Sequence, residues 1–113
     1  MAEKVVKIYD KEVKFKVTGA TPILYMSMFG SDFLKDFMEL EKAQAQGESP
    51  SLLPLYRIAY ALAKKADDSL PDMEAWLDSF EDGFPVADVV KELMPLIQMN
   101  FTTNAPKKTN PKK

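Results

Sequence analysis

Side chains able to do chemistry are few in this chain of 113 residues, which contains neither histidine nor cysteine. Their absence excludes thiol nucleophiles, Ser–His and Cys–His pairs, disulfides, and metal sites with imidazole or thiolate ligands. Carboxylates, lysines, tyrosines and hydroxyls remain, and enzymes that use only these groups are uncommon. We therefore expect a protein that is not an enzyme and needs no cofactor.

The closest approach to a metal site in the sequence is a group of carboxylates near residue 70. Asp67, Asp68 and Asp72 surround an expected turn, as calcium ligands can. The spacing lacks the central glycine and the terminal glutamate of an EF-hand loop. Aspartates at helix ends cap free backbone N–H groups, which accounts for the same residues without a metal. We expect no metal here, and an exposed acidic face at residues 78–82.

Charge is distributed unevenly along the chain, although its net value is only −2. Residues 106–113 carry four lysines and no acid, so the remainder of the chain carries −6. Residues 67–92 contain nine acidic residues and one basic residue, Lys91. Such a body repels phosphate, and nucleic acid is not an expected partner. A small regulator that binds nucleic acid through a lysine-rich hairpin face and the basic tail stays open as an alternative.

The sequence contains no segment typical of a membrane protein or of a secreted one. No apolar run approaches the ~20 residues that a membrane span needs, and the N-terminus lacks the pattern of a signal peptide. Length and composition are typical of one globular domain. We expect a cytoplasmic protein with one domain over residues 1–104 and a disordered basic tail over residues 105–113.

The N-terminal residues 4–17 alternate between apolar and polar side chains, which predicts a β-hairpin with one buried face. The apolar members are Val6, Ile8, Val13, Phe15 and Val17. A two-residue turn at Asp10 and Lys11 places Ile8 opposite Val13. Val6 then lies opposite Phe15, on the same side of the hairpin.

Helical spacing and helix-end residues predict about four helices after the hairpin. The first begins with Thr21 as its N-cap and contains a break near residues 30–32, where Ser31 caps a second segment. The second helix begins after Ser51, and the third begins at Pro71. The fourth follows Pro85 and is kinked or ended near a proline at position 95. The predicted fold class is α+β, mostly α, with the hairpin packed on this bundle.

The first predicted helix carries more large apolar side chains than one buried face requires. These side chains are Met26, Met28, Phe29, Phe33, Phe37 and Met38. Tyr56 and Tyr60 lie beside the inner stripe of the second helix. One interpretation is a central helix that is buried on all sides. The other is a groove or oligomer contact in which flexible methionines adapt to a helical partner.

Several strings in the chain resemble the tail assembly chaperones of long-tailed phages and prophages, particularly those of Gram-positive hosts. The resemblance spans nearly the whole chain and is carried by residues 4–16, 19–22 and 29–36, and most specifically by residues 58–67. The strings at residues 70–71 and 76–78 follow in the same order. Tyr60 departs from the pattern, because tryptophan is expected at this position.

The resemblance implies a protein that binds the long helical tape measure protein, keeps it soluble and promotes polymerisation of the tail tube. Such chaperones act in the host cytoplasm and are absent from the mature virion. Many also occur in a longer, frameshifted form that recruits the tube protein. Self-association is also expected. The alternative is a structural tail or head-completion subunit that is retained in the virion.

Overall fold

The structure is a computed structural model that describes residues 2–101. Its elements are β1 (Ala2–Ile8), β2 (Lys11–Val17), α1 (Thr21–Phe29), α2 (Phe33–Ala45), α3 (Leu52–Ala66), α4 (Met73–Asp78) and α5 (Val86–Phe101). The predicted class, α+β and mostly α with an N-terminal hairpin on a helical bundle, is confirmed. The end of the predicted domain at residue 104 and the predicted tail at 105–113 lie outside the described residues.

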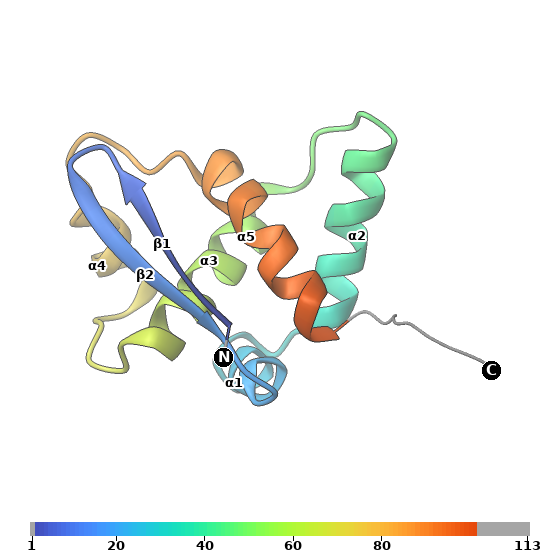
Figure 1. Cartoon of the computed structure of the whole chain (residues 1–113), viewed down its shortest axis with the longest axis horizontal. Coiled ribbons are helices and arrows are strands. Elements are labelled where there is room, and N and C mark those ends of the chain that lie inside the picture. Colours follow the sequence, from blue (N-terminus) through green and yellow to red (C-terminus); the bar gives the residue numbers. More distant parts are fainter. Residues whose placement is uncertain (1, 102–113) are drawn as a thin grey trace.

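The hairpin covers the two longest helices. β2 packs along α3, and β1 lies against α5 (Figure 1). The helix α4 lies beside the hairpin turn, whereas α2 stands at the other end of the molecule (Figure 1). Apolar residues from the buried face of the hairpin and from the inner faces of all five helices form one core cluster. The alternation and helical stripes of the sequence therefore converge on a single core.

The hairpin turn differs from the predicted one. Ile8 pairs with Lys11 and Val6 with Val13, so the loop consists of Tyr9 and Asp10 rather than Asp10 and Lys11. The observed register is shifted by two residues, which keeps every side chain on its predicted face. Val6, Ile8, Phe15 and Val17 are accordingly buried.

Charge explains the observed register of the hairpin. On its outer face Glu3 pairs with Lys16, and Lys7 pairs with Glu12. The predicted register would instead place Lys7 directly opposite Lys14. Opposite charges across a strand pair stabilise it, whereas like charges destabilise it by a similar amount. The charge pattern on the outer face therefore contained the signal for the correct turn.

Two of the predicted helix caps are also wrong. Thr21 is the first residue of α1, and its Oγ1 accepts a hydrogen bond from the Thr18 N–H at 2.9 Å. The predicted break after α1 is present, with Gly30 in the left-handed conformation. Asp32, not Ser31, caps α2, because its Oδ1 accepts from the Lys35 N–H at 3.1 Å. The carboxylate replaces the predicted hydroxyl as the acceptor at this helix end.

The starts of the later helices lie close to the predicted ones. Asp72 is the N-cap of α4, so the helix begins two residues after Pro71. The helix α5 does not end at Pro95 but continues to Phe101. Pro95 is exposed, while Leu93 and Ile97 beside it are fully buried. Burial of this inner face offsets the loss of one backbone hydrogen bond on the outer side of the helix.

Candidate partner-binding surface

Some large side chains of α1 lie in the core, and others are exposed on the surface. Tyr25 is fully buried, and Met28 and Phe29 are partly buried against the core. Met26 is 48% exposed and Ile23, one turn earlier, is 72% exposed. α1 is therefore not buried on all sides, and Ile23 and Met26 form an apolar strip on its outer side.

The helix α2 shows the same division. Phe33 and Phe37 are each only 1% exposed and belong to the core. Met38 is 64% exposed and lies one turn after Leu34, which is also exposed. Leu34 and Met38 thus form an apolar i, i+4 pair on the solvent side of α2.

The two tyrosines on α3 act mainly in packing. Tyr60 is 5% exposed, and its hydroxyl donates to the carbonyl oxygen of Pro71. Burial, and to a lesser degree the charge of Asp72, raises the pKa of Tyr60 above its ordinary value. Tyr56 is half-buried and packs against Phe84, with ring centroids 6.4 Å apart. Both rings thus join α3 to the segment that contains α4.

The eight residues singled out from the sequence consequently do not form one surface in the single chain. Met26 and Met38 are exposed, and Phe33, Phe37 and Tyr60 are in the core. Exposed apolar side chains that the sequence analysis did not single out are Val5, Tyr9, Ile23, Leu34, Leu52, Leu53 and Met99. Ile23 and Leu34 lie at helical spacing from Met26 and Met38, so periodicity within each helix did not distinguish this outer side from the buried one.

One buried polar contact fixes α1 against α2. The Tyr25 hydroxyl donates to Asp36 Oδ2 at 2.8 Å. Burial, followed by this hydrogen bond and the Asp36 charge, raises the pKa of Tyr25 well above its ordinary value. Arg57 lies 5.2 Å from the centroid of the Phe29 ring, a cation–π contact that links α3 to α1. These contacts link α1 to α2 and α3.

In the acidic turn near residue 70, carboxylates accept hydrogen bonds from backbone N–H groups. Asp67 Oδ1 accepts from both the N–H and the hydroxyl of Ser69, which lowers the pKa of Asp67. Asp72 Oδ1 accepts from the Ala75 N–H at 2.8 Å and caps α4. Within residues 2–101, no group of three or more candidate ligands is placed to hold a metal ion. The helix-cap interpretation accounts for Asp72, whereas the Asp67 carboxylate stabilises the turn after α3.

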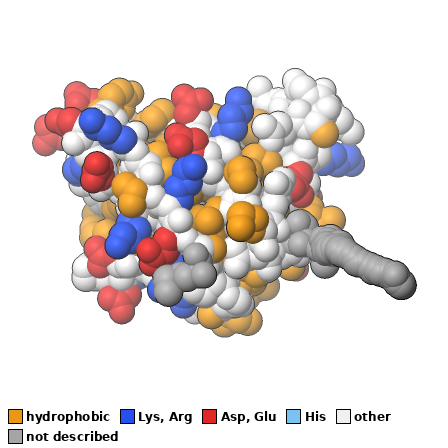
Figure 2. Space-filling model, viewed as in Figure 1, with side chains coloured by type: hydrophobic (Ala, Val, Ile, Leu, Met, Phe, Trp, Pro, Cys, Tyr) orange, Lys and Arg blue, Asp and Glu red, His pale blue; other side chains and the backbone are white. Residues whose placement is uncertain are grey.

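The outer hairpin face is less basic than its lysine content indicates. Lys7 and Lys16 each lie opposite a glutamate, and only Lys14 lacks an acidic cross-strand neighbour, because it faces Val5. On the face shown in Figure 2, acidic and basic side chains are interspersed over the end of the molecule that holds the hairpin turn and α4. Neither feature resembles the continuous basic surface that binds nucleic acid.

None of the helices within residues 2–101 is long and apolar enough to cross a membrane.

The chain matches no protein-family model, no curated protein and no solved structure. The surface features described above, together with the sequence resemblance, are therefore the basis for assigning a function.

Proposed function

We propose that this protein is a tail assembly chaperone that binds the tape measure protein of a long-tailed phage or prophage. The observation that carries the proposal is the exposure of Met26 and Met38 on α1 and α2. Both lie in the Met- and Phe-rich segment that contains one of the strings resembling this family. In this proposal the protein has no catalytic activity and no cofactor.

The chemistry of these exposed side chains suits such a partner. A tape measure protein has long helices with apolar stripes, which aggregate when they are left uncovered. Methionine side chains are unbranched and polarisable, so they pack against differently shaped apolar stripes. Ile23 and Leu34 enlarge the apolar area around Met26 and Met38. The negative charge of the body would keep a complex of many copies dispersed.

The further parts of the proposal concern other partners and location. The chaperone acts in the host cytoplasm, associates with further copies along the partner, and leaves before the virion is complete. A longer frameshifted form would bring the tube protein to the complex. Displacement by the tube protein would release the chaperone without any nucleotide.

Co-expression with the longest coiled-coil protein encoded downstream tests the proposal. The chaperone function predicts that this partner becomes soluble only with the protein present and co-purifies with many copies of it. The protein content of purified virions distinguishes the chaperone from a structural subunit. A chaperone is missing from the virions, whereas a tail or head-completion subunit is retained. A partner that stays insoluble and unbound contradicts the proposal. Salt-dependent DNA binding would favour the small regulator instead.

A further inference from the structure

The strand β2 has one edge that no other strand covers. The sheet contains two strands, so β2 pairs with β1 on one side only. Ile8 and Lys11 flank the two-residue loop, which makes them a hydrogen-bonded pair, and such pairs alternate along an antiparallel ladder. Glu12 and Lys14 therefore direct their backbone N–H and C=O groups away from β1. Among the described residues, no backbone hydrogen bond joins residues 12–16 to a segment other than β1.

An open groove, the edge groove, lies beside this free edge. It has a volume of about 630 Å³, and residues 11–14 of β2 form one of its walls. The end of α3, the segment after it and α4 form the others. The apolar residues of these walls are Ala63, Ala66, Leu70, Pro71, Trp76 and Phe80. A side chain that enters the edge groove from outside therefore meets a mainly apolar surface.

Lys11 bridges the edge groove near the hairpin turn. Its Nζ donates to the carbonyl oxygen of Ser79 at 3.0 Å and lies 4.7 Å from the centroid of the Phe80 ring. These contacts join β2 to the end of α4, which lies beside the turn (Figure 1). The groove is present in the single chain, and no element has to move to expose it.

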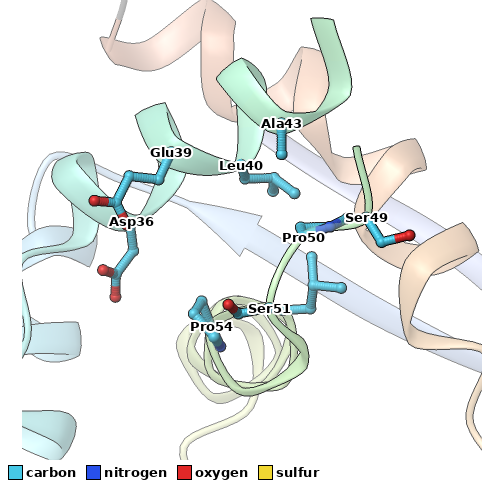
Figure 3. A pocket seen from close by; sticks show the side chains of 9 residues that line it. Asp36, Glu39, Leu40, Ala43, Ser49, Pro50, Ser51 and Pro54 are labelled. Atoms are coloured by element: carbon cyan, nitrogen blue, oxygen red, sulfur yellow. The ribbon is translucent and has the colours of Figure 1, made fainter. Parts of the chain in front are cut away.

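The pocket between α2 and the start of α3 lacks such an edge. Its volume is about 180 Å³, and its side chains come from α2, from the segment after it and from the first turn of α3 (Figure 3). No strand residue lines it. Backbone groups in helices are already paired within the helix, so this pocket cannot extend a sheet.

Charge on the outer face of the hairpin indicates the chemistry of an added strand. Lys14 lies on this face, and its cross-strand neighbour, Val5, carries no charge. A carboxylate directly opposite Lys14 on a third strand would form the missing opposite-charge pair. The residues before and after that carboxylate would point to the inner face, where Val13 lines the edge groove. These residues are expected to be apolar.

We propose that the edge groove binds an extended segment of a partner protein, which adds to β2 as a third, antiparallel strand. The segment has the pattern apolar–acidic–apolar. Its backbone pairs with the free groups of Glu12 and Lys14, its carboxylate lies beside Lys14, and an apolar side chain enters the groove. The β2 strand of a second folded copy does not fit, because it would bring its own α3, on which β2 packs, into the groove walls.

A synthetic peptide tests the inference. The probe is fluorescein-labelled Thr-Val-Thr-Val-Glu-Val-Thr, and its binding is measured by fluorescence anisotropy. The parent protein should bind it at least fivefold more tightly than the same peptide with lysine in place of glutamate, because only the glutamate can pair with Lys14. Methylation of the peptide's backbone nitrogens should abolish binding, since it removes the donors of the added strand. No binding to the parent protein, or equal binding of the methylated peptide, overturns the inference.

Charge reversal places the peptide in the groove. Lys14→Glu should reverse the preference, so that the variant binds the lysine peptide more tightly than the glutamate peptide. The matched control, Lys91→Glu, makes the same change of charge at an exposed position of α5 that does not line the groove, and it should keep the preference of the parent. Circular dichroism confirms that both variants are folded. An unchanged preference in Lys14→Glu contradicts the proposed site.

Hydrogen exchange of single amides provides a second readout on the unmodified protein. The Lys14 N–H should exchange faster than the Val13 N–H, because only the latter is bonded to β1. Saturating peptide should slow exchange at Lys14 by about tenfold or more. A Lys14 amide that the peptide does not protect overturns strand addition. A Lys14 amide protected in the free protein by raising its concentration identifies a second copy as the occupant and also overturns the inference.

The inference goes beyond the proposed function and does not depend on it. Met26 and Met38, on which the chaperone proposal rests, do not line the edge groove. Neither experiment involves the tape measure protein. Failure of the edge groove and failure of the chaperone function are therefore distinguishable.

Discussion

The Tyr25 hydroxyl donates a 2.8 Å hydrogen bond to Asp36 Oδ2, and this bond joins α1 to α2. Tyr25 itself is fully buried, whereas Met26 beside it is 48% exposed. One side of α1 thus fixes the position of α2, and the other side presents the apolar strip. The two roles can be separated by mutation.

Tyr25→Phe removes the hydrogen bond and keeps the packing of the ring. We expect the free energy of unfolding at pH 7 to fall by about 1.5–3 kcal/mol, the usual net value of a hydrogen bond to a charged group. Chemical denaturation monitored by circular dichroism measures this change. A variant as stable as the parent would show that the bond contributes nothing to the α1–α2 contact.

The same variant has a distinct dependence on pH. Burial and the bond to Asp36 raise the pKa of Tyr25 above its ordinary value of 10.0. Above pH 10 the unfolded chain therefore releases a proton that the folded protein retains, and stability falls as the pH rises. Tyr60 contributes in the same direction. Tyr25→Phe should show a shallower loss of stability above pH 10 than the parent, and an identical slope would contradict the assignment.

Phe33→Ala should destabilise the protein by about 3–5 kcal/mol, because the ring is 1% exposed and its loss leaves a cavity. Met38→Ala, on the outer side of the same helix, should change stability by less than about 0.5 kcal/mol. Thermal melts of both variants provide the comparison. If Met38→Ala is as damaging as Phe33→Ala, Met38 is not a surface residue.

The hairpin turn offers a stabilising substitution. Tyr9 has φ 58°, a left-handed conformation that is costly for most side chains, and its ring is 56% exposed. Asparagine adopts this conformation more readily, so Tyr9→Asn should stabilise the protein by about 1 kcal/mol. Denaturant titration tests this value. Loss of stability would place the turn elsewhere, as in the register with Asp10 and Lys11 in the loop.

The fold class was predictable because the alternation of residues 4–17 and the helical stripes leave few alternatives. The turn was not predicted correctly, since registers two residues apart place the same side chains on the buried face and differ in cross-strand pairs such as Lys7 and Glu12. Caps were misassigned by one residue for a similar reason. Ser31 and Asp32 both have suitable side chains, and local geometry selects the carboxylate.

The candidate site was predictable only as a segment. Composition identified residues 26–38 as unusually rich in methionine and phenylalanine. Which side of each helix faces the core depends on long-range contacts such as that between Phe33 and Phe101, which periodicity within one helix does not specify. Met26 and Met38 were therefore grouped with Phe33 and Phe37. In the structure the two methionines are exposed, whereas the two phenylalanines are buried in the core.

The most direct test of the chaperone function is the fraction of the tape measure protein that is soluble on co-expression. The parent protein should keep it soluble, and the pair Met26→Gln with Met38→Gln should not, because the two exposed methionines become polar without a change in charge. The matched control, Leu52→Gln with Leu53→Gln, replaces two exposed side chains in the first turn of α3 and should retain solubility. An insoluble partner with the parent protein, or equal solubility with the methionine variant, would contradict the account.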